Sequence, residues 1–264
     1  MHQAVRRWLN VVATVALLTG LAAGGPTHAQ TQSAPPAAPA SAFSPQQRAE
    51  IVQILRDALA HDPTILREAV DTLQADDARR LETATRAAIA THRAALSDPA
   101  DPVAGNPKGD VTIVEFFDTR CPYCRHLEPT MSQFLDRDHK VKLVYKDLPI
   151  LGPTSVLGSR ALLAAQRQGG YEKLREAIMA SPPDVNMDAI QQLAIAAGLD
   201  WTRMQRDMAD PAIQARLDAN TRLARDLGIQ GTPALVIGDT LIPGAVEVAD
   251  LQKAVAGARA TARN

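Results

Sequence analysis

The chain has 264 residues, of which 46% are hydrophobic, and a formal net charge of −1. This length is compatible with one domain or two, and no Arg-rich or Lys-rich block provides the basic surface that nucleic acid binding requires. We therefore expect no nucleic acid partner. The chain contains only two cysteines, Cys121 and Cys124.

The N-terminus has the pattern of a secretory signal peptide. Arg6 and Arg7 precede an apolar run from Leu9 to Ala23, and small residues occupy the cleavage-determining positions of Thr27-His28-Ala29. We predict that residues 1–29 are a signal peptide, cleaved after Ala29, and that the protein is periplasmic. The alternative is an uncleaved membrane anchor, for which the apolar run is short. Export leads to an oxidising compartment, in which disulfides persist.

Residues 30–44 are rich in Ala, Pro and Ser without any period, which predicts a disordered linker. A helix is predicted to start there, with Ser44 as its N-cap and Pro45 in its first turn. Asp62 is the predicted N-cap of a second helix, and Pro63 is its predicted first residue. Helical patterns then continue to about residue 97.

A narrow apolar stripe runs along this N-terminal module, which we place at residues 45–97. Its members at helical spacing are Ile51, Leu55, Leu59, Leu66 and Leu73. Helices this small bury too little surface to form a core of their own, so the stripe needs a partner. That partner is either the rest of the chain or other copies of it. We favour a homo-oligomer formed through residues 45–95, because exposed apolar faces otherwise promote aggregation.

From Asp98 onward, a turn-rich boundary leads into strands that alternate with helices. The predicted strands cover 111–117, which is nearly all apolar, 140–146, which alternates, and two short stretches within "TPALVIGDTLIPG". The predicted helices cover Cys121 to about Arg137, with a bend near Pro129, several segments between 154 and 227, and Val246 to about Ala258. The order predicts an α/β fold for residues 98–264, with a helical insertion at about 154–227.

The two cysteines lie where the strand 111–117 passes into a helix. They can close only a four-residue loop, which is too small to staple a fold. Cys121 falls at the helix N-terminus, where unpaired N–H groups and the helix dipole lower the pKa of a thiol. Cys124 lies one turn further on, within reach of a mixed disulfide formed at Cys121. We predict that Cys121 is an exposed, partly ionised nucleophile and that Cys124 is the resolving thiol.

The residues between and around the thiols have smaller predicted roles. Pro122 suits the first helical turn, and Tyr123 tunes the surroundings of the thiols. Arg120 and Arg125 add positive potential. A zinc site is the main alternative, but it requires two further ligands, and His126 on the same turn cannot supply both. An inert buried disulfide is the other alternative. We expect no metal site and no cofactor.

A second candidate feature is Gly231-Thr232-Pro233, just before a predicted strand. A proline that enters a strand in this way is compatible with a cis peptide bond. Such a bond would turn the Thr232 backbone outward, toward the thiols and toward an extended substrate chain. The alternative is an ordinary turn.

A third candidate is Glu115, inside the apolar strand. A buried, isolated carboxylate has a raised pKa and can exchange a proton with Cys124. Lys142 on the neighbouring strand is a candidate ion-pair partner. The alternative is a glutamate at the strand end that reaches solvent.

These motifs together resemble the DsbA-like branch of exported thioredoxin-fold oxidoreductases. The resemblance rests on "VTIVEFFDTRCPYC", "KDLPILGPTS" and "GIQGTPALVIGD", and it covers about residues 100–260. It implies that Cys121 attacks, Cys124 resolves, Thr232 and a cis-Pro233 contact substrate, and Glu115 is a buried acid. The Pro122-Tyr123 dipeptide differs from the Pro-His of strongly oxidising members, so a very high redox potential is not implied.

The N-terminal module is similar to that of ScsC-like members, on the stretch "ILRDALAHDPTILREAVDTLQ". This resemblance implies self-association through the N-terminal helices, disulfide isomerisation and copper tolerance. The apolar stripe points to self-association independently.

The hypothesis that combines these features is a periplasmic thiol–disulfide oxidoreductase whose clients are exported cysteine-containing proteins. An oligomer favours disulfide isomerisation and needs a membrane redox partner that keeps the thiols reduced. A monomer favours oxidation of client thiols, with a quinone-linked partner. A hypothesis of another class is copper(I) sequestration, because two neighbouring thiolates suit a soft ion.

Overall fold

The computed structural model describes residues 42–262. The predicted signal peptide and most of the predicted linker therefore lie outside the described residues. The chain divides after Pro63 into two compact units, which are described separately below. A domain boundary near residue 97 remains a prediction.

The first unit contains one described helix, α1 (Pro45–His61). Its start is the predicted capping arrangement: the Gln47 backbone N–H donates to Ser44 Oγ at 3.2 Å, and the Ser44 N–H donates to Gln47 Oε1 at 2.8 Å. α1 has no buried residue, and Ile51, Leu55 and Leu59 of the apolar stripe are exposed. The helix therefore presents an unburied apolar face.

The second unit begins with α2 (Thr64–Thr91), followed by the short α3 (Arg93–Leu96). The sequence predicts a helix after Pro63 and further helix up to Leu96, and the structure joins most of this into α2. Leu66 and Leu73 near its start are exposed, whereas Ile89 and Leu96 are buried in a core cluster. The end of α2 is thus part of the globular core. No helix within residues 42–262 combines the length and apolar character needed to cross a membrane.

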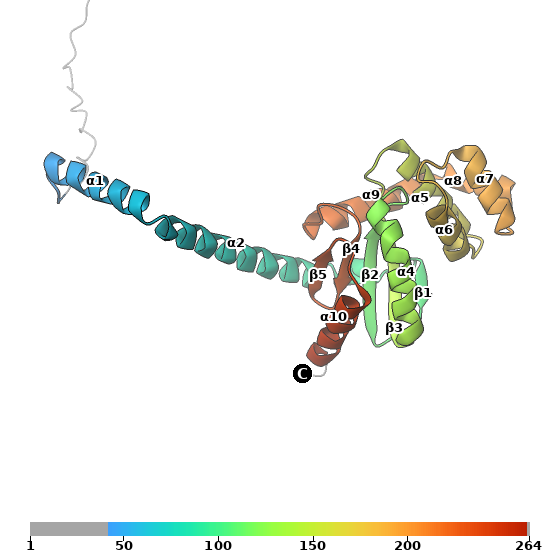
Figure 1. Ribbon diagram of the computed structural model, residues 1–264. Helices are drawn as coiled ribbons and strands as arrows, with labels where there is room; N and C mark the ends of the chain where they lie inside the picture. Colours follow the sequence, from blue (N-terminus) through green and yellow to red (C-terminus); the bar gives the residue numbers. More distant parts are fainter. Residues whose placement is uncertain (1–41, 263–264) are drawn as a thin grey trace, which may run out of the picture. The chain divides into compact units, whose positions relative to one another are not determined.

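A five-stranded sheet forms the centre of this unit, in the order β1-β3-β2-β4-β5 (Figure 1). The strands are β1 (Val103–Gly105), β2 (Val111–Phe117), β3 (Val141–Asp147), β4 (Ala234–Ile237) and β5 (Thr240–Pro243). β2 and β3 are parallel, and the other pairs are antiparallel. The predicted central strand is confirmed as β2. β1 was not predicted, because three residues within a turn-rich stretch carry no strand pattern.

Both faces of the central strands are buried. Ile113 and Phe117 of β2 face one core cluster, while Val114 and Phe116 face the other. The second predicted strand, 140–146, is confirmed as β3, which begins and ends one residue later. β3 is buried at all but one position, because helices cover both faces of the sheet.

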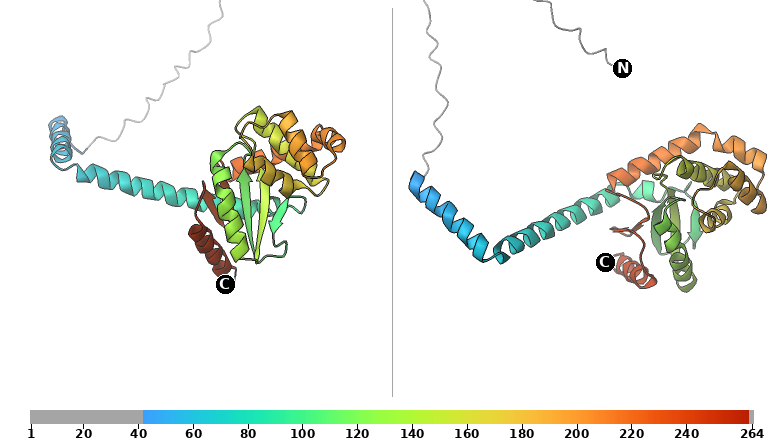
Figure 2. Two further views of the ribbon diagram at one scale, coloured as in Figure 1. Left: turned by 45° about the vertical axis from the view of Figure 1, so that its right-hand side comes forward. Right: turned by 45° about the horizontal axis from the view of Figure 1, so that its top comes forward.

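Helices complete the two layers. α4 (Pro122–Arg137) connects β2 to β3, and α10 (Val248–Thr261) ends the described chain. These two helices pack against each other on one side of the sheet (Figure 2). The insertion consists of α5 (Pro153–Gln166), α6 (Tyr171–Ala180), α7 (Met187–Ala196), α8 (Trp201–Met208) and α9 (Pro211–Asp226). The predicted thioredoxin-like α/β fold with a helical insertion is confirmed.

Candidate active site

A short rigid turn carries the chain from β2 to Cys121. The Asp118 carboxylate accepts hydrogen bonds from the backbone N–H groups of Arg120 at 2.8 Å, Ile150 at 2.8 Å and Leu151 at 3.0 Å. Cys121 is the N-cap of α4 and has an extended backbone, with Pro122 at the first helical position. This geometry places the Cys121 sulfur at the positive end of the helix.

The second part of the site comes from the other end of the sequence. The Thr232-Pro233 peptide bond is cis, as the sequence suggested. In the register of β2 and β4, Ala234 lies opposite Phe116, so the residues just before β4 lie next to the turn that leads to Cys121. The Cys121 thiol donates a hydrogen bond to the Thr232 carbonyl oxygen at 3.1 Å, across 111 residues of sequence.

The surroundings lower the pKa of Cys121 to about 5. The largest cause is a hydrogen bond with the Cys124 thiol, with contributions from the Thr232 side chain and from the backbone N–H groups of Cys124 and Tyr123; burial opposes them. The prediction of an exposed sulfur was wrong, because Cys121 is only 4% exposed. Tyr123 beside it is exposed.

Cys124 has the opposite electrostatic environment. It lies on the buried face of α4, and this burial raises its pKa far above that of a free thiol. Its hydrogen bond to Cys121 and the negative charge of Glu115 act in the same direction. At neutral pH the pair therefore consists of one thiolate and one thiol, which is the arrangement that lets the first attack and the second resolve.

Glu115 faces the same core cluster as Ile113 and Phe117, since side chains alternate along β2. It is fully buried, which excludes the alternative of a glutamate that reaches solvent. Burial raises its pKa to about 7, although the positive charge of Arg175 opposes the shift. A carboxyl group with this pKa can both accept and return a proton near neutral pH.

The partner of Glu115 is Arg175 of α6, and the prediction of Lys142 was wrong. Arg175 Nη2 lies 3.5 Å from Glu115 Oε2, whereas Lys142 pairs with Thr112 in the sheet register. Arg175 also forms two hydrogen bonds to Glu128 of α4, at 2.5 and 2.8 Å. Its guanidinium lies 4.6 Å from the centre of the Phe117 ring and 4.0 Å from that of Tyr145.

Arg175 was missed in the sequence, although a signal for it exists. It occupies an apolar position of its helix, between Leu174 and Ile178, both of which are buried. A single cation on a buried helix face requires a buried anion, and Glu115 is the carboxylate within the central strand.

Arg125 ties the active-site helix to the insertion. Its guanidinium donates to the carbonyl oxygens of Thr119 at 2.6 Å, Met179 at 2.7 Å and Ser181. The sequence suggested an exposed source of positive potential. The structure instead gives this side chain three carbonyl partners, which fix the first turn of α4 against α6.

Within residues 42–262, no cluster of three or more His, Cys, Asp or Glu side chains is arranged to hold a metal ion. His126 does not join Cys121 and Cys124 in such a cluster. The pair itself offers two sulfur ligands, which suit a two-coordinate soft cation better than zinc.

Comparisons with known proteins agree with this geometry. The profile of the DSBA-like thioredoxin domain matches residues 112–256, and that of the copper resistance protein ScsC N-terminal domain matches residues 47–80. A thioredoxin-like oxidoreductase from Silicibacter pomeroyi is 45% identical with a TM-score of 0.62, covering 63% of this chain and 97% of that one. Proteus mirabilis ScsC in a transitional conformation is 29% identical with a TM-score of 0.61, covering 83% and 98%.

A curated relative of a different kind is the Na(+)/H(+) antiporter NhaA 3 of Salinispora tropica. It is 28% identical over 174 residues, which cover 64% of this chain but only 27% of the antiporter. The chain thus spans well under half the length of that relative.

Proposed function

Since this chain belongs to the DSBA-like thioredoxin family, we propose that it is a thiol–disulfide oxidoreductase acting on cysteine-containing exported proteins. The observation that carries the proposal is the Cys121 sulfur, with a pKa lowered to about 5 and 3.1 Å from the Thr232 carbonyl oxygen. A reactive thiolate beside a backbone segment that could pair with an extended polypeptide is what disulfide exchange with such a client requires.

The proposed reaction begins when the Cys121 thiolate attacks one sulfur of a client disulfide. The enzyme–client S–S bond forms, the client S–S bond breaks, and the released client thiolate takes a proton from water. Cys124 then gives its proton to the Glu115 carboxylate and attacks the Cys121 sulfur. The Cys121–Cys124 disulfide forms, the enzyme–client S–S bond breaks, and the second client sulfur leaves as a thiolate that takes a proton from water. The client gains the two electrons that the enzyme loses, and oxidation of a client runs in reverse.

We assign substrate contact to Thr232 and Pro233, on the support of their position against Cys121. Pro122 sets the first turn of α4, and the exposed Tyr123 borders the thiol. Glu115 is assigned proton exchange with Cys124. None of these assignments requires a cofactor.

Trapping tests the proposal directly. Cys124→Ala should accumulate mixed disulfides between Cys121 and clients, which non-reducing electrophoresis and mass spectrometry would detect, because the resolving thiol is missing. Cys121→Ser should trap nothing and is the control. Failure of Cys124→Ala to form a mixed disulfide with any peptide or protein disulfide would refute the assigned roles.

The finer proposal is an oligomeric disulfide isomerase in the periplasm, exported by a signal peptide over residues 1–29. Its support is the unburied apolar face of α1, together with the match of residues 47–80 to the ScsC N-terminal domain. Several active sites around one client would let a client thiol, instead of Cys124, resolve the mixed disulfide. A membrane thiol–disulfide partner would keep the pair reduced. A monomeric oxidase is the alternative.

Deleting residues 45–74 tests self-association. This deletion spares Ile89, whose burial makes the end of α2 part of the core, so the remaining unit should stay folded. We expect the mass from light scattering to fall to that of one chain, with loss of scrambled-ribonuclease reactivation but retention of peptide oxidation. An unchanged number of chains per particle would contradict the oligomer proposal.

Copper(I) sequestration is the second candidate. It is supported by the two neighbouring sulfurs and by the copper resistance protein to which residues 47–80 are similar. Copper titration of the reduced protein, run beside a disulfide-exchange assay, separates the two functions. Tight copper binding with no exchange would favour sequestration over the enzyme.

A further inference from the structure

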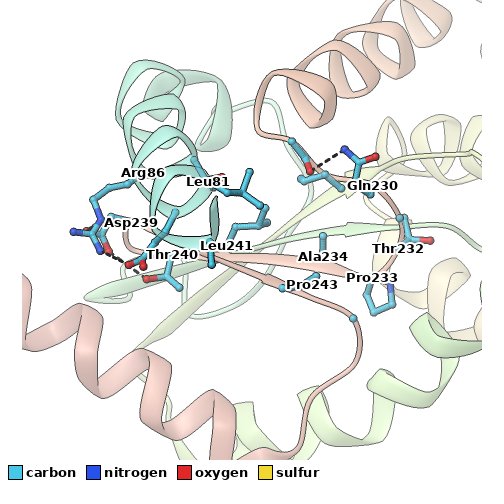
Figure 3. A pocket seen from close by; sticks show the side chains of 17 residues that line it. Leu81, Arg86, Gln230, Thr232, Pro233, Ala234, Asp239, Thr240, Leu241 and Pro243 are labelled. Atoms are coloured by element: carbon cyan, nitrogen blue, oxygen red, sulfur yellow. Dashed lines mark hydrogen bonds and ion pairs between the residues drawn. The ribbon is translucent and has the colours of Figure 1, made fainter. Parts of the chain in front are cut away.

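A cavity of about 790 Å³ lies beside the Thr232-Pro233 loop, and we refer to it as the α2 trough (Figure 3). One wall is α2 and the others are the loop that leads into β4 and the hairpin of β4 and β5. The residues that line it are Ala78, Leu81, Glu82, Thr85 and Arg86 of α2, residues 228–234, and residues 239–241, 243 and 244. All belong to the second compact unit.

The α2 wall is one face of the helix. Its five lining residues follow the spacing i, i+3, i+4, i+7 and i+8, which aligns them along the helix axis. Leu81 on this face is 65% exposed. Figure 3 shows its side chain next to that of Leu241 of β5. Ile89, two turns after Leu81, is buried in the core and anchors the wall.

The charged groups of the trough are paired among themselves. Arg86 lies 3.0 Å from Glu82 and 3.3 Å from Asp239. The rest of the lining consists of apolar side chains, three threonines, Gln230 and glycines, and the Gln230 side chain donates to the Gly228 carbonyl oxygen. The trough therefore offers an apolar surface without an unpaired charge, which suits neutral apolar side chains.

The trough and the redox site share the Thr232-Pro233 loop. Thr232 and Pro233 line the trough, and the Thr232 carbonyl oxygen is the atom 3.1 Å from the Cys121 sulfur. A chain held in a mixed disulfide at Cys121 passes this loop, so residues a few positions from its cysteine reach the trough. Apolar side chains are what an unfolded client exposes and a folded one buries.

We propose that the α2 trough binds apolar residues flanking the reacting cysteine of an unfolded client, so that α2 serves as a substrate-selecting wall. This inference rests on the proposed function. Leu81 and Arg86 lie between the two profile matches, which end at residue 80 and begin at residue 112, so neither match covers them. The trough gives α2 a role separate from self-association.

The chain offers a matched pair of leucines to test this. Leu81 and Leu73 are on the same helix and are each 65% exposed, but only Leu81 lines the trough. Leu81→Ser and Leu73→Ser are compared in full-length mature protein. The substrates are two peptide disulfides, one with Leu and Val beside the cysteines and one with Ser and Gly. Oxidised glutathione, too small to reach the trough, gives the reference rate for each variant.

We expect the original protein to react faster with the apolar peptide than with the polar one. Leu81→Ser should lower the ratio of the apolar-peptide rate to the glutathione rate about tenfold, as expected for a lost apolar contact, whereas Leu73→Ser should keep that ratio. Ala78→Trp, which fills the trough, should lower the ratio in the same way. If the unfolding midpoint of Leu81→Ser shows that this variant is poorly folded, Ala78→Trp serves as the test variant in its place.

Three results would overturn the inference. One is an equal preference for both peptides in the original protein. Another is an equal ratio in all variants. The third is a changed particle mass in Leu81→Ser without a changed ratio, which would mean that a second copy of the chain occupies the trough. Absence of any reaction, with glutathione included, would instead refute the proposed function itself.

Discussion

α1 and α4 are similar helices with different surroundings. They have 17 and 16 residues, and each starts with an N-cap followed directly by proline. α4 buries Cys124, Leu127, Met131 and Phe134 against the sheet, whereas α1 buries none of its residues. An amphipathic pattern therefore predicts a helix and its apolar face, but it does not say whether the covering surface belongs to the same chain.

The two helices also differ in what their N-cap side chains do. Ser44 Oγ accepts the Gln47 N–H, which is a purely structural role. At the same position in α4 a sulfur replaces the oxygen, and its thiol donates to the Thr232 carbonyl oxygen. The same local geometry thus gives a helix start in one case and a reactive group in the other.

The largest expected effect comes from substituting each of these two N-cap residues in turn. Cys121→Ser should lower the rate of disulfide exchange at least about a thousandfold, because the nucleophile is lost. Ser44→Ala should cost α1 about 1 kcal/mol and leave the exchange rate unchanged. Peptide-disulfide kinetics and thermal unfolding by circular dichroism measure the two effects. Residual exchange in Cys121→Ser near the original rate would contradict the assignment.

A smaller effect is expected from truncating the two apolar faces. Leu127→Ala should lower the free energy of unfolding by about 2–5 kcal/mol, because Leu127 lies on the buried face of α4. Leu55→Ala should change the free energy of unfolding by less than about 0.5 kcal/mol at a dilution that keeps the chain monomeric, because Leu55 is exposed. Denaturant unfolding at high dilution compares them. Equal losses would mean that α1 is covered within its own chain.

The smallest effect concerns the buried charges that join α4 to the insertion. Arg175 lowers the pKa of Glu115 against the effect of burial. Arg175→Met should therefore raise that pKa and move the resolution of a mixed disulfide by Cys124 to higher pH, by about one pH unit. Arg175→Lys should retain most of the original profile. A lower rate with an unmoved pH profile would mean that Arg175 acts only through packing.

Much of the fold follows from local patterns in the sequence. The Ser44-Pro45 start, the break at Asp62-Pro63 and the buried strand 111–117 depend on caps, proline and apolar runs that act over a few residues. β1 could not be predicted in this way, because its three residues are a strand only through pairing with β3. The burial of β3 on both faces likewise depends on helices far away in the sequence.

The candidate site shows the same division. Cys121, Cys124 and the cis Thr232-Pro233 bond follow from short motifs, whereas the partner of Glu115 does not. Arg175 lies 60 positions from Glu115 and reaches it only because the insertion packs on β2 and α4. The contact of the Cys121 sulfur with the Thr232 carbonyl oxygen likewise joins residues 111 positions apart.

The most direct test of the account is a pH titration of the reduced protein, followed by the ultraviolet absorbance of the thiolate. With Cys121→Ser as the blank, we expect one thiolate that forms with a midpoint near pH 5, because the surroundings lower the pKa of Cys121 to about 5. The folded reduced protein should then gain stability, relative to that variant, as the pH rises from about 5 toward the pKa of an unfolded cysteine. A midpoint at the pH of a free cysteine would contradict the account.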